Sequence, residues 1–115
     1  MKKSIVQEKS FDFALLIIEL FQKLQAEREY IISKQLLRCG TSIGANVSEA
    51  LAGESRADFI HKMAVSSKEA RETLYWLKLL NRSQMVELDY TPYIENCEQL
   101  VKILTSIVKT STSLA

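Results

Sequence analysis

Apolar residues recur along this chain at alternating steps of three and four, the spacing of a helix with one buried face. In the first segment the repeat consists of Phe13, Ile17, Leu20 and Leu24. The pattern predicts four helices with short polar links between them, over residues 4–26, 30–52, 56–81 and 92–110. Because short links make consecutive helices antiparallel neighbours, we expect one all-α domain over residues 1–115, an up-down-up-down antiparallel four-helix bundle.

The two later helices carry the same kind of stripe. In the third it consists of Phe59, Met63, Ser66, Ala70, Thr73, Leu77 and Leu80, and in the fourth of Tyr93, Cys97, Leu100, Leu104 and Ile107. Local signals mark the helix ends. Ser55 is a good N-cap for the third helix, Thr91 suits the same role for the fourth, and Gly53 suits a left-handed residue after the second.

Two glycines, Gly40 and Gly44, lie inside the second predicted helix. Each costs about 1 kcal/mol relative to alanine in a helix interior. One interpretation is a helix that is weakened or broken there, and the other is a site where a neighbouring helix approaches closely. The apolar period continues from Ile32 to Ala50 through both glycines, which favours close packing.

Polar residues run beside the buried stripes of the second and third helices. They predict an interhelical polar network made of Ser42, Asn46, Glu49, Ser66 and Glu69. A buried carboxylate is costly unless it is paired or hydrogen-bonded, and Arg38 and Ser67 could supply partners. A ligand or catalytic site and a contact between subunits remain alternatives for the same residues.

The net charge is +1, which gives no strong attraction to nucleic acid. The distribution is uneven, however, because residues 30–82 carry eight Lys or Arg against five Asp or Glu. We therefore take as candidate phosphate contacts Lys34, Arg38, Arg56, Lys62, Lys68, Arg71, Lys78 and Arg82. The alternative is an ordinary solvated helical surface.

The residues offer little for catalysis. His61 is the single histidine, and Asp58 to His61 is one imperfect match to the Glu-x-x-His spacing of di-metal bundles. We expect no enzyme activity, cofactor, metal site or small-molecule substrate.

Cys39 and Cys97 are expected to be buried free thiols. With no signal peptide or membrane-spanning run in the sequence, we expect a cytoplasmic protein without membrane contact.

Residues 74–80 are apolar on nearly every side of the third helix. A small bundle cannot bury all of them, so either this end is central to the core or part of it meets another subunit. Tyrosine and tryptophan are typical interface anchors. Tyr75 and Trp76 are therefore the predicted subunit interface.

Two long motifs resemble a known family. They are Gln35-Leu36-Leu37-Arg38-x-Gly40-Thr41-Ser42-Ile43-Gly44-Ala45-Asn46-x-x-Glu49-Ala50 and, further on, Ser55-x-x-Asp58-Phe59-Ile60-x-Lys62-Met63 followed by Ser67-Lys68-Glu69-Ala70-x-Glu72-Thr73-x-Tyr75-Trp76-Leu77. Both are similar to the signature of the four-helix-bundle proteins encoded in intervening sequences of 23S ribosomal RNA genes. The accessory proteins of diversity-generating retroelements look like relatives.

The resemblance implies a cytoplasmic bacterial four-helix bundle that assembles as a ring-like homopentamer. It implies no enzymatic activity. The related retroelement proteins bind nucleic acid and a reverse transcriptase, so RNA or a nucleic-acid enzyme is a candidate partner. Our first hypothesis is a non-enzymatic homo-oligomeric scaffold that binds RNA. The alternative is a protein-binding adaptor that contacts no nucleic acid and docks its partner through the apolar surface of residues 75–80.

Overall fold

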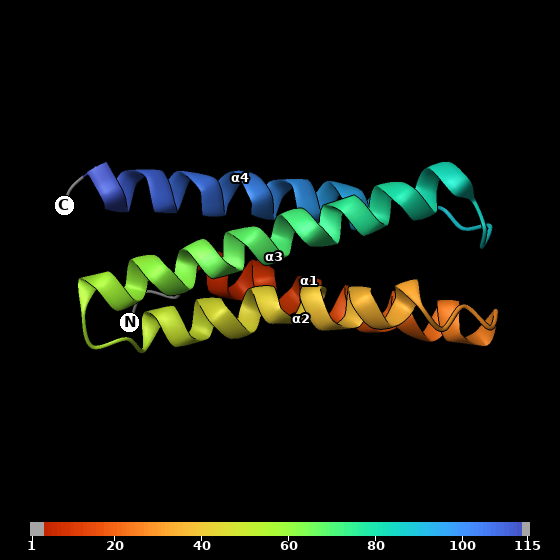
Figure 1. The fold of residues 1–115 in the computed structure, drawn as a ribbon, viewed down its shortest axis with the longest axis horizontal. Coiled ribbons are helices and arrows are strands. Elements are labelled where there is room, and N and C mark those ends of the chain that lie inside the picture. Colours follow the sequence, from red (N-terminus) through yellow and green to blue (C-terminus); the bar gives the residue numbers. More distant parts are fainter. Residues whose placement is uncertain (1–3, 114–115) are drawn as a thin grey trace.

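The computed structural model describes residues 4–113, which form four long helices (Figure 1). They are α1 (Ile5–Ala26), α2 (Ile32–Leu51), α3 (Arg56–Ser83) and α4 (Thr91–Ser113). Consecutive helices run in opposite directions and pack against each other, and α1 also contacts α4, which closes the bundle. The predicted all-α, up-down-up-down four-helix bundle is confirmed. The molecule is elongated, about 46 Å long and 23 Å across.

The apolar stripes predicted from the sequence form the core. The side chains of Phe13, Ile17, Leu20 and Leu24 on α1 are almost completely buried, as are those of the corresponding residues on the other three helices. Phe59 and Ile107, at the ends of their stripes, are only partly buried. Among residues 4–113, no helix is both long and apolar enough to cross a membrane.

Helix α2 continues without a break through both of its glycines, and the interpretation of a broken helix is wrong. A Cβ atom on Gly40 would lie 2.8 Å from Cγ1 of Ile17, and one on Gly44 would lie 3.2 Å from the backbone oxygen of Ser10. Both distances are shorter than ordinary van der Waals contact. The glycines therefore allow α1 and α2 to approach closely, as the uninterrupted period indicated.

The helix ends differ from the predictions in three places. Ser55 caps α3 as expected, its Oγ accepting from the backbone N–H of Asp58. Gly53, in contrast, is not left-handed, so that prediction is wrong; the N–H of Gly53 simply donates to Ala50 O in an ordinary turn. Helix α4 begins at Thr91 itself, and the carboxylate of Asp89 accepts the Thr91 N–H at 3.0 Å.

The third difference is at the start of α2, where Glu29 caps the helix from the preceding link. This carboxylate is buried and accepts the backbone N–H groups of Ile31, Ile32 and Ser33 at 3.0, 2.9 and 2.6 Å. The hydroxyl of Ser33 donates back to Glu29 O at 2.7 Å. The predicted polar link thus contains the residue that fixes where α2 begins.

Candidate nucleic-acid interface

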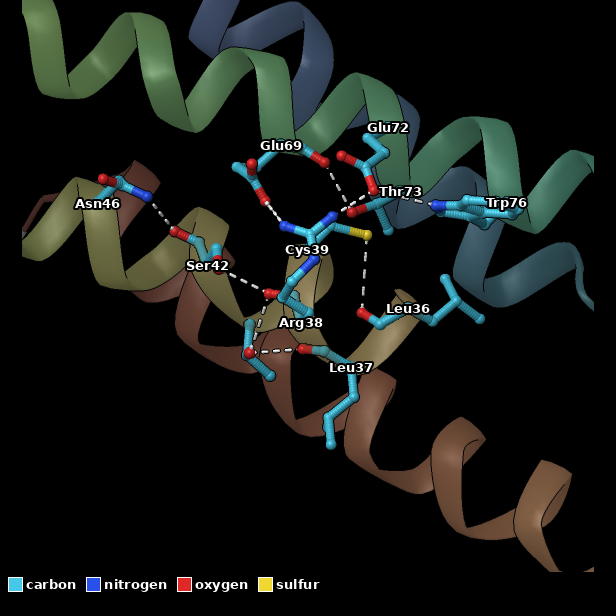
Figure 2. Close-up of polar contacts among 11 residues, drawn as sticks. Leu36, Leu37, Arg38, Cys39, Ser42, Asn46, Glu69, Glu72, Thr73 and Trp76 are labelled. Atoms are coloured by element: carbon cyan, nitrogen blue, oxygen red, sulfur yellow. Dashed lines mark hydrogen bonds and ion pairs between the residues drawn. The ribbon is translucent and has the colours of Figure 1, made fainter. Parts of the chain in front are cut away.

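An ion-pair cluster joins α2 to α3 in the middle of the bundle (Figure 2). The Arg38 guanidinium lies between the carboxylates of Glu69, at 3.2 Å, and Glu72. The indole N–H of Trp76 donates to the same Glu72 carboxylate at 3.1 Å. This indole hydrogen bond, with Arg38 beside it, lowers the pKa of Glu72 below its usual value. The positive charge of Arg38, whose side chain is partly exposed, is therefore balanced by carboxylates of the same chain.

The predicted interhelical polar network forms only in part. Two of its members act between helices: Glu69 pairs with Arg38, and the buried Ser66 hydroxyl donates to Ile43 O at 2.8 Å. Ser42 and Asn46 instead donate to backbone oxygens one turn back in α2, at 2.6 and 2.9 Å. Short polar side chains readily make such bonds within a helix, which is why their spacing did not reveal their partners.

Glu49 is the remaining member of that network, and it does not reach the other predicted members. Its side chain is mostly exposed and pairs with Lys62 Nζ at 2.9 Å on the outside of the α2–α3 contact. The Glu49 carboxylate raises the pKa of Lys62. Lys62, like Arg38, is thus a candidate phosphate contact whose charge already has a partner within the chain.

The other candidate phosphate contacts lie elsewhere. Lys34 is exposed on α2. Arg56 and Arg71 reach from α3 to α4, where their Nη2 atoms donate to Ser111 O at 3.0 Å and to Thr105 Oγ1 at 3.2 Å. The exposed side chains of Lys68, Lys78 and Arg82 complete the set. Apart from Lys34, the predicted phosphate contacts therefore separate into a paired group between α2 and α3 and a group along α3.

Two hollows lie between α3 and α4, and together we name them the α3/α4 groove. The Arg71 hollow, of about 390 Å³, is lined by Ala64, Ser67, Lys68, Arg71, Thr105, Val108 and Lys109. The Tyr75 hollow, of about 550 Å³, is lined by Tyr75, Lys78, Leu79, Asn81, Arg82 and Ile94. Each contains Lys or Arg, and within residues 4–113 neither lining includes a carboxylate. The groove could accommodate an anion.

Lys109 is a groove residue that the sequence analysis missed. It lies in the chain's acidic last third, where its charge is outnumbered locally. Only the antiparallel packing of α4 on α3 brings it to the same hollow as Lys68 and Arg71. Thr105 and Lys109 are one turn apart on α4 and therefore lie on the same face of this helix. That spacing is the sequence signal that could have placed Lys109 beside the groove.

The two residues predicted as a subunit interface have different environments. Trp76 is partly buried, and its N–H is occupied by Glu72. Tyr75 is 58% exposed and meets Trp76 edge to face, with ring centroids 5.4 Å apart. A second apolar surface, not predicted from the sequence, lies on the outside of α1, where Phe11, Leu15 and Ile18 are 66%, 53% and 39% exposed.

The described residues offer little of the usual chemistry of an active site. Cys39 and Cys97 are buried free thiols, as expected, and burial raises the pKa of Cys97 to about 12. Such a thiol stays protonated and is a poor nucleophile near neutral pH. Among residues 4–113, no group of three His, Cys, Asp or Glu side chains could hold a metal ion.

Comparisons with known proteins agree with this fold. The sequence model of the family described as 23S rRNA-intervening sequence protein matches residues 2–106. A crystal structure of a protein of unknown function from the S23 ribosomal protein family of Bacteroides thetaiotaomicron shares 44% sequence identity. It superposes with a TM-score of 0.86, covering 91% of this chain and 99% of that one. No curated protein matches the chain.

Proposed function

Because the chain belongs to the 23S rRNA-intervening sequence protein family, we propose that it is a non-enzymatic, homo-oligomeric scaffold that binds RNA. The observation that carries RNA binding is the α3/α4 groove. Lys68, Arg71, Lys78, Arg82 and Lys109 line its two hollows. Lysine and arginine that have no carboxylate partner keep their charge available for the phosphates that dominate nucleic-acid affinity.

The small overall charge of +1 does not oppose this proposal. Arg38 and Lys62 are balanced by Glu69, Glu72 and Glu49, so three of the five acids within residues 30–82 are used on the α2–α3 side. Four of the six other Lys and Arg residues of this segment line one groove, and a local potential of this kind attracts a polyanion even when the net charge is small. The groove thus provides a defined surface for RNA, whereas positive charge spread evenly over the molecule would not.

A charge-reversal experiment tests the proposal. Native protein is titrated into a labelled fragment of 23S ribosomal RNA, and affinity is read by fluorescence anisotropy, alongside Lys78→Glu in the groove and Lys34→Glu on α2. Both lysines are exposed and undergo the same change in charge. We expect Lys78→Glu to weaken binding at least tenfold, the scale of one lost charged contact of about 1.4 kcal/mol, and Lys34→Glu to have little effect. Equal effects of the two variants would exclude the groove.

Self-association is the second part of the proposal. The exposed Phe11, Leu15 and Ile18 form an apolar strip on α1, at helical steps of four and three. Exposed apolar patches of this kind mark interfaces between proteins. The pentameric ring, the cytoplasmic location and the relation to the accessory proteins of diversity-generating retroelements, all implied by the sequence resemblance, stay predictions.

The alternative function is a protein-binding adaptor without nucleic-acid contact. The exposed side chains of Tyr75 and Leu79 favour it, since they present an aromatic ring and an aliphatic group on the α3 surface. Failure of the native protein to bind RNA even at low salt would favour this adaptor function over the scaffold.

A further inference from the structure

We infer that the α3/α4 groove is specific for single-stranded RNA: the Arg71 hollow takes a backbone phosphate, and Tyr75 stacks against an unpaired base. This inference rests on the proposed RNA-binding function and assigns its ligand class. It combines a cationic hollow, an unused hydroxyl and an exposed aromatic ring that lie in sequence along one face of α3.

The Arg71 hollow has the donors that an oxyanion requires. Ser67 lines the hollow, and its hydroxyl oxygen, which has no hydrogen-bond partner within residues 4–113, is not enclosed by protein and so is open to the hollow. The hydroxyl can therefore donate to water or, in its place, to a ligand in the hollow. The guanidinium of Arg71 is oriented by its bond to Thr105 Oγ1 at 3.2 Å, and the remaining N–H groups of its five stay free for phosphate oxygens.

Two lysines flank these donors. Lys68 is one residue from Ser67 on α3, and Lys109 comes from the facing α4. Three positive charges, one hydroxyl and a lining without carboxylate make a site for a single phosphate group. A hollow of about 390 Å³ is larger than one phosphate needs, so the attached sugars of a strand can enter with it.

Tyr75 supplies the second element, a stacking surface. Its ring is 58% exposed at the edge of the neighbouring hollow. The ring is supported from one side by Trp76, which Glu72 and Arg38 hold in turn (Figure 2). A supported, exposed tyrosine beside lysine and arginine is the arrangement that binds unpaired bases without sequence preference.

The spacing of these groups fits a strand that runs along the groove. Arg71, Tyr75, Lys78 and Arg82 follow each other at steps of four, three and four residues on α3. At a rise of about 1.5 Å per residue, the eleven steps from Arg71 to Arg82 span about 16 Å. That length accommodates several nucleotides of a strand. In a duplex the bases are paired and stacked inside, where Tyr75 cannot reach them, so the arrangement favours a single strand.

The test compares single-stranded and double-stranded RNA on the full-length protein. A labelled ten-nucleotide RNA and its duplex are titrated by fluorescence anisotropy with native protein, Tyr75→Ala, Tyr75→Phe and Arg71→Gln. Tyr30→Ala is the matched control, because Tyr30 is also an exposed tyrosine, at 48%, but lies between α1 and α2. Circular dichroism checks that each variant keeps its helices.

We expect the native protein to bind the single strand about tenfold or more tighter than the duplex. Tyr75→Ala should weaken single-strand binding about 5- to 100-fold, the range for one stacked base, while Tyr75→Phe and Tyr30→Ala keep native affinity. Arg71→Gln should weaken it and reduce the log–log salt slope by about 0.7. Equal affinity for duplex, or an unaffected Tyr75→Ala, would overturn this inference and leave RNA binding itself intact. Absence of any RNA binding at low salt would overturn both.

Discussion

Glu29 illustrates how much one side chain can contribute at the residue scale. Its two carboxylate oxygens accept three backbone N–H groups at the start of α2, groups that have no partner within the helix. Side-chain oxygens at this position stabilise a helix both by hydrogen bonding and by their charge at the positive end of the helix dipole. A glutamate four residues before a serine is a weak sequence signal, and the charged residues around it concealed this role.

Replacing Glu29 tests that role. We expect Glu29→Ala to lower the free energy of unfolding by about 1–2 kcal/mol, the usual cost of a lost N-cap, since three backbone donors, one of them buried, lose their acceptor. Urea unfolding followed by circular dichroism measures the change. Glu27→Ala, two residues earlier and exposed, is the control and should change stability by less than about 0.5 kcal/mol. A similar small effect for Glu29→Ala would show that the cap is dispensable.

Glu72 gives a prediction about pH. The Trp76 indole and Arg38 lower the pKa of its carboxylate, so the ionised form is favoured in the folded state. Its contribution to stability is present above the unfolded value of about 4.3 and is lost as the pH falls through the lower folded value. Trp76 is the single tryptophan, and its fluorescence should therefore change on acidification with a midpoint below that of an ordinary glutamate.

The variant Glu72→Gln removes the titrating group and keeps a hydrogen-bond acceptor for the indole. We expect it to abolish that fluorescence transition, whereas Glu98→Gln, an exposed glutamate on α4, should leave it unchanged. If the fluorescence transition persists at the same midpoint in Glu72→Gln, a titrating group other than Glu72 causes the change in Trp76 fluorescence.

At the scale of elements, the helices could be predicted almost completely. The observed helices start and end within three residues of the predicted ranges. Apolar residues at helical spacing, such as Phe13 to Leu24, mark the buried face of each helix and so indicate its extent. The ends were harder. The conformation of Gly53 depends on how α2 turns into α3, and the cap on α2 depends on a buried glutamate, neither of which a local pattern specifies.

The close contact between α1 and α2 yields a prediction on this scale. Gly40→Ala would place a Cβ 2.8 Å from Ile17, whose branched side chain has little freedom to move. Overpacking of this kind costs about 1–3 kcal/mol and outweighs the gain of about 1 kcal/mol in helix propensity. We expect a lower thermal midpoint by differential scanning calorimetry. The control is Ala45→Gly, on the exposed side of α2, which should lose stability only through the lower helix propensity of glycine. An increase in midpoint for Gly40→Ala would contradict the close-packing account.

On the scale of the whole molecule, the candidate site was only partly predictable. Counting charges found most of the groove residues, because a helix rich in lysine and arginine is visible in the sequence. It could not show that Arg38 and Lys62 already have carboxylate partners across the α2–α3 contact, or that Lys109 joins Arg71 across the α3–α4 contact. Those pairings depend on which helices are neighbours and on their relative register, and both emerge only when the bundle is assembled.

The apolar strip on α1 leads to a prediction about assembly. If it forms the interface of the proposed homo-oligomer, Leu15→Glu should reduce the molar mass in solution to that of the monomer while the helical circular dichroism signal is kept. Burying a glutamate without a partner costs several kcal/mol at an interface. Size-exclusion chromatography with light scattering measures the mass. Met85→Glu, at an equally exposed apolar residue between α3 and α4, should leave it unchanged. A native protein that is monomeric at micromolar concentration would contradict self-association.

The most direct test of RNA binding by the α3/α4 groove is the salt dependence of affinity for a single-stranded RNA fragment. Five lysines and arginines line the two hollows. If three to five of them contact phosphate, the log of the binding constant should fall with the log of the salt concentration with a slope of about −2 to −3.5, and Lys78→Glu combined with Arg82→Glu should reduce this slope by about 1.4. No binding at low salt, or a slope that this double variant leaves unchanged, would contradict the account.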